Sequence, residues 1–305
     1  MSPTGLWMKS SAVPARPPES ETPLETVEVL GVRFHNLTRS QAARAIAATS
    51  RAGRSGYVVK PYSEFMPRAA RDPRLRDILN AADLCLADGI GVLWAAHYLA
   101  LTGGPLRALA QLPLSLAALA FNPAAVRHPL KENMAGVDLT WEMLARLDEA
   151  GSTLFLLGGT EAEASGARRR IEERFPRLRV VGTHHGYFDA SGEQNERIIE
   201  AINAAAPDAL LVAMGFPRQE EWIVDNLSRL GVGVAVAEGG SFSFISGAAP
   251  RAPRWLRRVG LEWLFRLLRQ PWRLRRQLAI PQLIWLVVRQ RLRWTKGAGG
   301  ERTAR

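Results

Sequence analysis

The chain has 305 residues, of which 47% are hydrophobic, and it carries a formal net charge of +11. This length accommodates one large or two modest domains with a substantial core, and a mean hydropathy of −0.08 argues against a polytopic membrane protein. The single cysteine, Cys85, excludes an intrachain disulfide framework and a cysteine-rich zinc cluster, and it is typical of a reducing cytoplasm.

The first 25 residues are rich in Pro and Ser and contain no apolar stretch typical of a secretion signal. Such a composition cannot bury enough apolar surface to fold alone. We therefore expect a disordered tail over residues 1–25.

From residue 26 onward, short apolar runs alternate with amphipathic helical patterns. The runs expected to form strands are residues 57–59, 84–86, 153–157, 179–181, 209–213 and 232–236. The helical patterns lie before or between them, over residues 39–48, 74–81, 91–99, 139–149, 161–174, 193–204 and 219–230. This alternation predicts an α/β domain over residues 26–250, with a doubly wound, Rossmann-like sheet that carries helices on both faces.

A hydrophobic insertion near residues 100–130 interrupts this alternation. Its longest uncharged run, residues 108–126, contains Pro113, Asn122 and Pro123, so it is a poor membrane-spanning helix. Two interpretations stay open: a helical hairpin packed on the core, or an apolar surface that dips into a bilayer.

Positive charge is concentrated at the C-terminal end of the chain. Residues 251–296 contain twelve arginines and one lysine against one acid, a net charge of +12, whereas residues 1–250 carry −2. Leu and Trp are interspersed among these arginines, which predicts a basic amphipathic helical appendage over residues 251–296 and a flexible end over residues 297–305. Such a segment needs an anionic partner: a phospholipid surface, a nucleic acid or a phosphorylated ligand.

Doubly wound sheets bind their ligands at the carboxyl ends of their strands, so the loops that follow the strands form the candidate site. Asp88 follows the run 84–86 after one residue, Ala87, and precedes Gly89. An aspartate at this place is often only a helix N-cap, but a catalytic carboxylate would lie there too.

Two further loops carry glycine at the start of a helix. Gly158 and Gly159 would allow backbone amides to approach a phosphate, although they form neither a GxGxxG fingerprint nor a P-loop. Gly215 leads through Pro217 into Arg-Gln-Glu at residues 218–220. This turn either caps a helix well or presents guanidinium and amide groups to a ligand.

Seven motifs occur in one order along the chain and cover roughly residues 28–280. They are ARDPRLRDILNAADLCLADGIGV, AGVDL, LFLLGGTEAEA, FPRLRVVGTHHGYF, MGFPRQEEW, EGGSFSFISGAAPRAPRW and GLEWLFRLLRQPWRLRR. Together they resemble the WecG/TagA/CpsF glycosyltransferase family, glycosyltransferase family 26, and residues 100–130 are an insertion relative to it.

The resemblance implies an inverting transfer of a sugar from a UDP-sugar donor to a lipid-linked acceptor, an undecaprenyl-diphosphate-linked sugar. Members of this family build bacterial surface polysaccharides and cell-wall polymers at the cytoplasmic face of the membrane. The resemblance assigns the general base to Asp88, makes Gln219 the glutamine of the family's PKQE motif, and gives phosphate stabilisation to Arg266, Arg273 and Arg276. We expect a peripheral protein on the inner face of the cell membrane that contacts an anionic membrane surface and no nucleic acid; self-association into a homo-oligomer stays open.

The chemistry of an inverting transfer fits these residue types. One carboxylate must accept the proton of the acceptor hydroxyl, and positive charge must meet the leaving diphosphate. The sequence contains no Asp-x-Asp motif. We therefore predict a reaction without a metal or other cofactor, in which planar guanidinium groups bind the phosphate oxygens.

The sequence departs from the family pattern at three places, and these departures bear on sugar specificity. Lys60 and Tyr62 stand where Thr-x-Asn is usual, Asn133 stands where Arg is frequent, and Ser243 replaces the Asp of GGxFD. Substrate binding is expected from Lys60, Tyr62, Gly136, Asp138, Gly158, Gly159, Gly215, Arg218, Gln219, Glu220, Gly239 and Gly240.

Two other classes of protein stay open. The Arg/Trp-rich tail could bind nucleic acid, although its Leu and Trp content suits lipid better and no RRM, helix-turn-helix or zinc-finger pattern occurs. The substitutions at Lys60 and Tyr62 also fit a non-catalytic partner in a polymer-assembly complex. Turnover of a UDP-sugar separates the enzyme from both alternatives.

Overall fold

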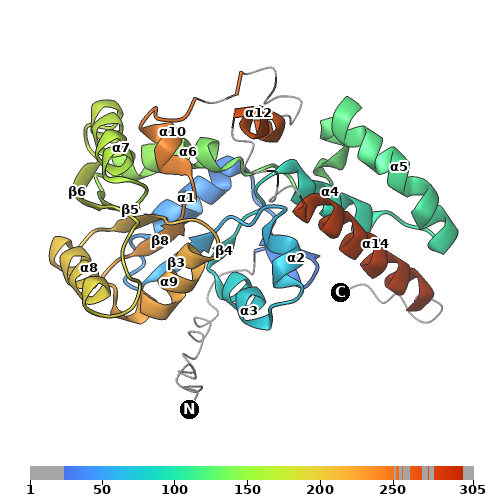
Figure 1. The fold of residues 1–305 in the computed structure, drawn as a ribbon, viewed down its shortest axis with the longest axis horizontal. Helices are drawn as coiled ribbons and strands as arrows, with labels where there is room; N and C mark the ends of the chain where they lie inside the picture. The colour runs from blue at the N-terminus through green and yellow to red at the C-terminus, as the bar shows by residue number, and fades with distance from the viewer. Residues whose placement is uncertain are drawn as a thin grey trace, which may run out of the picture.

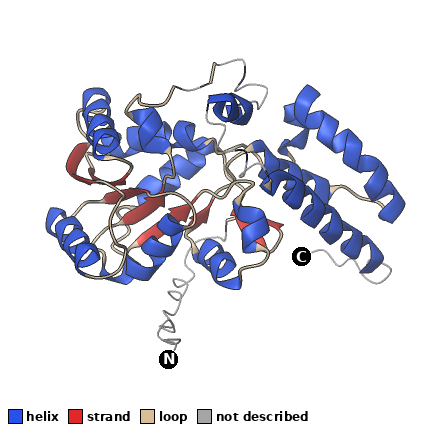
Figure 2. Ribbon diagram, in the orientation of Figure 1, coloured by secondary structure: helices blue, strands red, loops and turns tan. Residues whose placement is uncertain are grey.

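A six-stranded parallel sheet forms the centre of the molecule, with helices on both of its faces (Figures 1 and 2). The computed structural model describes residues 24–250, 252, 253, 256, 262–269, 274 and 278–297. The strand order is β4-β3-β8-β7-β5-β6. Their bounds are β3 (Gly56–Val59), β4 (Leu84–Cys85), β5 (Thr153–Gly158), β6 (Arg179–His184), β7 (Ala209–Ala213) and β8 (Val234–Ala237). The predicted α/β fold class is confirmed, and each of the six expected strands forms, the last beginning two residues later than expected.

The two faces of the sheet carry separate hydrophobic cores because successive strand residues point to opposite sides. In β5, Phe155 and Leu157 lie in the first core, whereas Leu154 and Leu156 lie in the second. The helices of the first face are α2 (Phe65–Ala69), α3 (Pro73–Ala81), α4 (Ile90–Ala100), α8 (Glu193–Ala205) and α9 (Arg218–Asn226), which continues into η2 (Leu227–Arg229). Those of the second face are α1 (Arg39–Thr49), α6 (Gly136–Glu149), α7 (Glu161–Arg174) and α10 (Ser241–Ile245).

A topological switch point lies between β3 and β8, which are neighbours in the sheet. The chain leaves β3 toward α2 on the first face, but it leaves β8 toward α10 on the second face. Diverging connections open a crevice at the carboxyl ends of such strands, where doubly wound sheets bind ligands.

An antiparallel hairpin, β1 (Thr26–Val29) and β2 (Val32–His35), precedes the sheet and was not predicted. Its two-residue turn has positive φ at both positions, 51° at Leu30 and 81° at Gly31. Such a turn matches the twist of a tight hairpin, but a leucine there gives no sequence signal.

The segment expected to be a hydrophobic insertion forms α5 (Pro105–Phe121), with Pro113 inside it, and the short helix η1 (Pro123–Arg127). Figure 1 shows α5 and α14 (Ala279–Gly297) grouped with α4 to one side of the sheet, and these three helices contact one another. Thus α14, which lies in the segment expected to be an appendage, packs on the body of the protein, where Leu283 and Val287 are buried. The other described helix of that segment is α12 (Glu262–Arg269).

The ends expected to be disordered or flexible lie mostly outside the described residues, which begin at Leu24 and end at Gly297. Within the described part of the chain, no helix combines the length and the apolar character needed to cross a membrane.

Candidate active site

A buried ion pair lies at the switch point. Lys60 follows β3 and Glu238 follows β8; Nζ of the lysine lies 2.8 Å from Oε1 of the glutamate, and their side chains are 5% and 0% exposed. The hydroxyl of Thr140 in α6 donates to Oε2 of Glu238 at 2.6 Å. The charge of Lys60 is therefore matched inside the protein by a carboxylate on the neighbouring strand.

The loop after β4 places Asp88 beside the loop after β3. The amide of Asp88 donates to the carbonyl of Pro61 at 3.0 Å, and the amide of Gly89 donates to Oδ1 of Asn133 at 2.7 Å. Gly89, whose φ is +90°, occupies the N-cap position of α4, and no side chain caps this helix. The loop is thus fixed from two sides. Asp88 is not the N-cap residue of α4, so helix capping does not explain an aspartate at this position.

The N-terminus of α6 approaches the Asp88 carboxylate. A Cβ placed on Gly136, the first residue of α6, would lie 3.1 Å from Oδ2 of Asp88. The start of a helix stabilises negative charge through its unpaired amides and its dipole. Glycine at this position therefore lets the helix start lie close to the carboxylate.

Aromatic rings connect the loops after β3 and β7. The ring of Tyr62 stands edge-on to Phe65 with centroids 4.8 Å apart, and Phe65 stacks on Phe216 with centroids 3.6 Å apart. The Tyr62 hydroxyl donates to Glu64 at 3.1 Å. A Cβ on Gly89 would lie 3.9 Å from Cβ of Tyr62, so this tyrosine lies beside the Asp88 loop.

Gln219 joins the turns after β7 and β8. Its Oε1 accepts hydrogen bonds from the amides of Gly215 at 3.2 Å and Gly239 at 2.9 Å. Its Nε2 donates to Oε1 of Glu220 at 2.8 Å. The buried amide group of Gln219 thus contacts protein groups and joins these two turns.

The neighbouring Glu220 is 1% exposed. Burial raises the pKa of its carboxyl to about 8, and the hydrogen bond from Gln219 opposes this shift. Near neutral pH this carboxyl is therefore mainly protonated.

The glycines of the strand-end loops differ in the space around them. A Cβ on Gly215, Gly239 or Gly240 would meet no atom within 4 Å, so open space lies over these turns. A Cβ on Gly158, in contrast, would lie 2.4 Å from the carbonyl oxygen of Ala213. The amide of Gly159 already donates to that oxygen at 3.0 Å. Room for a ligand therefore lies beside the ends of β7 and β8. Close packing against Ala213 explains the glycine at position 158, the last residue of β5.

Three other residues singled out from the sequence contact nearby segments. Arg218 donates to the carbonyls of Gly186 at 2.9 Å and of Phe188, which holds the loop after β6. Ser243 donates to the Glu163 carboxylate. Oδ2 of Asp138 lies 3.9 Å from Nη1 of Arg39.

Burial acts to raise the pKa of Glu163. Hydrogen bonds from Ser243 and Thr160 outweigh burial and lower the pKa below its usual value.

The tail arginines lie largely beyond the described residues. Arg266 belongs to the backbone of α12, whereas Arg273 and Arg276 lie outside the described residues. Across the residues the structure does describe, no three His, Cys, Asp or Glu side chains gather as metal ligands would.

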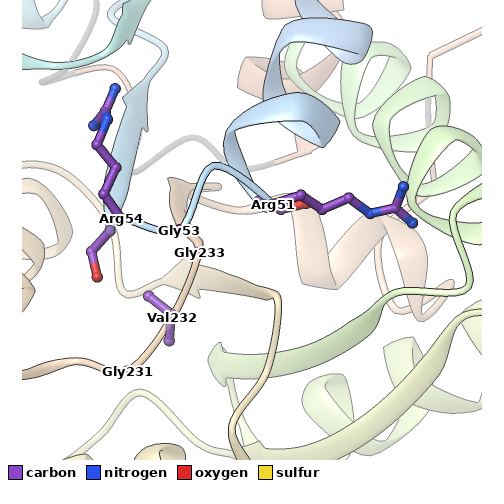
Figure 3. A pocket seen from close by; sticks show the side chains of 8 residues that line it. Arg51, Gly53, Arg54, Gly231, Val232 and Gly233 are labelled. Atoms are coloured by element: carbon purple, nitrogen blue, oxygen red, sulfur yellow. The ribbon is translucent and has the colours of Figure 1, made fainter.

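A shallow depression lies at the opposite end of the strands, where β3 and β8 begin (Figure 3). Arg51 and Arg54 line it and point away from each other. The Arg51 guanidinium donates to the carbonyl of Ala150, and Arg54 pairs with Asp83 at 2.6 Å. Both guanidinium groups thus have protein partners, and the depression is remote from the strand ends that carry Asp88 and Lys60.

The sequence interpretation missed the roles of Glu238 and Thr140. An acid two residues after the run 232–236 was a usable signal, because Lys60 follows the end of the run 57–59. Only the strand order makes these two loops neighbours.

Comparison with known proteins identifies relatives of the chain. The model of the "Glycosyl transferase WecG/TagA/CpsF family" matches residues 27–121 and 119–297, so its two segments meet inside α5. The chain is 28% identical over 265 residues to the N-acetylglucosaminyldiphosphoundecaprenol N-acetyl-beta-D-mannosaminyltransferase of Staphylococcus aureus strain MW2. The aligned residues cover 86% of this chain and 92% of that relative. The protein of the same description in strain NCTC 8325 / PS 47 matches with the same identity and coverage.

Proposed function

Because the chain belongs to the WecG/TagA/CpsF family of glycosyltransferases, we propose that it transfers a sugar from a UDP-sugar to N-acetylglucosamine linked to undecaprenyl diphosphate. The acceptor is proposed from the S. aureus relative, whose description names N-acetylglucosaminyldiphosphoundecaprenol. The product would be a lipid-linked disaccharide used for a bacterial surface polysaccharide or cell-wall polymer.

The position of Asp88 is the observation that carries the proposed mechanism. Its carboxylate lies beside the N-terminus of α6, in a loop at the carboxyl ends of the strands that is fixed by Pro61 and Asn133. In the proposed reaction the acceptor oxygen attacks the anomeric carbon while the bond from that carbon to the UDP oxygen breaks. Asp88 accepts the proton of the acceptor hydroxyl, and attack opposite the leaving group inverts the anomeric centre.

The donor diphosphate fits the open space over Gly215, Gly239 and Gly240. We assign the neutralisation of its charge to tail arginines, from the family resemblance and from the absence of Asp-x-Asp in the sequence. A guanidinium group offers paired donors that match two phosphate oxygens and can replace a metal ion in this role.

A location on the inner face of the cell membrane follows from the proposed acceptor, whose polyprenyl chain is embedded there. The net charge of +12 over residues 251–296 supports contact with anionic lipid. Nucleic-acid binding by the same segment remains the second candidate for these charges.

The decisive experiment is turnover by an Asp88→Asn variant. We expect it to fold normally and to lose roughly two to four orders of magnitude in UDP release with a soluble short-chain acceptor, the usual range for a general base. Asp77→Asn is the matched control, because Asp77 is exposed on α3.

Near wild-type turnover by the Asp88→Asn variant would contradict the assignment of the base. Absence of turnover with every UDP-sugar tested, for a folded wild-type protein, would favour the non-catalytic or nucleic-acid-binding alternatives.

A further inference from the structure

The side of α5 that faces away from the protein is apolar. Leu106, Leu114 and Phe121 are 85%, 71% and 88% exposed, and Leu109 is 48% exposed. Together with the exposed Ala110, Pro113 and Ala117 they form one stripe, since they recur every three or four residues of the helix. We call these seven residues the α5 outer face. Within α5 itself, Arg107 in the first turn is the only charged residue.

The opposite side of α5 is held firmly by specific contacts. Trp94 donates through Nε1 to Oγ of Ser115 at 3.1 Å, and the Tyr98 hydroxyl donates to the carbonyl of Ala108 at 2.7 Å. Gln111 accepts a hydrogen bond from the buried Arg291 of α14. The helix therefore packs on the core through one side and presents the other side outward.

The neighbouring α14 presents residues suited to a lipid headgroup region. Trp285 and Trp294 are 56% and 48% exposed, and the Arg289 guanidinium lies 5.1 Å from the centre of the Trp285 ring. Trp is enriched where hydrocarbon meets water, because its ring is apolar and its N–H is polar. Arg293 is also exposed on this helix.

The helices grouped with α5 carry only positive charges. Residues 89–131 and 263–300 contain no Asp or Glu, so α4, α5, η1 and α14 carry no acid. Their basic residues are Arg107, Arg127, Arg289, Arg291, Arg293 and Lys296, of which Arg291 is buried. An apolar face on a group of helices whose only charges are basic complements a surface of acyl chains covered by anionic headgroups.

We propose that the α5 outer face inserts into the surface of an anionic phospholipid bilayer, with α14 alongside it at the level of the headgroups. This inference rests on the proposed membrane location and names the surface that makes the contact. It assigns the anchor to the insertion, in addition to any contact made by the basic residues of the tail.

The helices that would lie at the membrane, α4 and α14, are close to the candidate active site. α4 begins two residues after Asp88. A Cβ on Gly91, in the first turn of α4, would lie 3.7 Å from Cδ2 of Leu283 in α14. Insertion of the α5 outer face would hold both helices, and the loop of the proposed base, beside the membrane that contains the acceptor.

A bilayer is favoured over a second copy of this chain. Pairing two α5 outer faces would bring two acid-free, basic helix groups together, and like charges at an interface oppose association. An anionic bilayer satisfies the apolar stripe and the surrounding charges at once.

The first test measures vesicle binding of the full-length protein with the combined substitutions Leu106→Gln, Leu114→Gln and Phe121→Gln. These side chains are exposed, so the fold should persist. We expect at least roughly tenfold weaker binding to phosphatidylglycerol-containing vesicles, because three apolar groups no longer insert. The matched control is Val181→Gln with Tyr187→Gln, which changes exposed apolar residues next to β6 and should bind as wild type.

The second test locates the contact with a dye. Cys85 is 1% exposed, so a cysteine introduced by Leu114→Cys can be labelled selectively with an environment-sensitive fluorophore. Its emission should shift to the blue on adding these vesicles and be quenched by nitroxides on the lipid chains. A label at Tyr187→Cys should show neither change.

Unchanged vesicle binding by the triple variant, or a label at position 114 that stays in water while the protein is bound, would overturn the proposal. So would light scattering that shows a wild-type dimer abolished by the triple substitution while vesicle binding persists. Turnover with a soluble acceptor, which the triple variant should retain, separates this proposal from the proposed function. Insertion without any turnover would refute only the latter.

Discussion

Removing Lys60 should show how strongly the folded protein depends on the buried ion pair between Lys60 and Glu238. In a Lys60→Met variant the Glu238 side chain, which is 0% exposed, would keep only the Thr140 hydroxyl among the partners in the described residues. Removal of one member of a buried pair typically costs about 3–5 kcal/mol, because the remaining charge stays desolvated. At about 2–4 °C per kcal/mol, the melting temperature should fall by roughly 6–20 °C.

Replacing both members should cost much less than replacing one. In a Lys60→Met, Glu238→Leu double variant no charge stays buried, and such exchanges are often close to neutral. Urea unfolding of the wild type, both single variants and the double variant gives the coupling free energy, which we expect to be at least about 2 kcal/mol. The control is Arg54→Met, which breaks a pair whose arginine is 45% exposed and should cost less than about 1 kcal/mol.

A Lys60→Met variant no less stable than Arg54→Met would refute a stabilising role of the buried pair. Strictly additive effects in the double variant would refute it as well, since they would mean that the two charges do not stabilise each other in the folded protein.

Three further predictions concern the site. Glu220→Gln should remove a pH dependence of stability: burial raises the pKa of Glu220 to about 8, so the folded state holds this proton more tightly than the unfolded chain. The stability that this proton provides is complete below about pH 4.5 and is lost as pH rises through about 8. Over that interval, urea unfolding should show the free energy of unfolding of the wild type falling relative to that of the variant. Parallel pH curves of the two proteins would contradict this. Gly136→Ala should fold but lower turnover, because its Cβ would lie 3.1 Å from Oδ2 of Asp88; unchanged kcat would show that the helix start does not influence the base. Single Arg→Lys substitutions at Arg266, Arg273 and Arg276 should lower turnover, measured as UDP release, without weakening vesicle binding, because Lys loses the paired donors. Wild-type turnover should persist in EDTA. Full activity of all three variants, or complete loss of wild-type activity in EDTA, would oppose the assignment of these arginines to the diphosphate.

The sequence alone was sufficient for the fold class and for one part of the site. Alternating apolar runs and helical patterns report which residues are buried, and burial periodicity is a local property of the chain. For this reason the six strands were predictable, and so was the place of Asp88 after a buried strand. The hairpin β1–β2 was not predicted, because its turn places Leu30 at a φ of 51° and leucine is not a residue typical of such turns.

The tertiary structure decided how these local pieces meet. Lys60 and Glu238 are distant in the chain, and they pair because packing on two faces of the sheet sets β3 beside β8. The same holds for Gln219, whose amide joins the turns after two neighbouring strands. Likewise, the uncharged run 108–126 fits a packed hairpin and a lipid-binding surface equally well as a sequence. Contacts from Trp94, Tyr98 and Arg291 decide which side of α5 is buried and leave the other side apolar and exposed, because the orientation of a helix depends on the partners that pack against it.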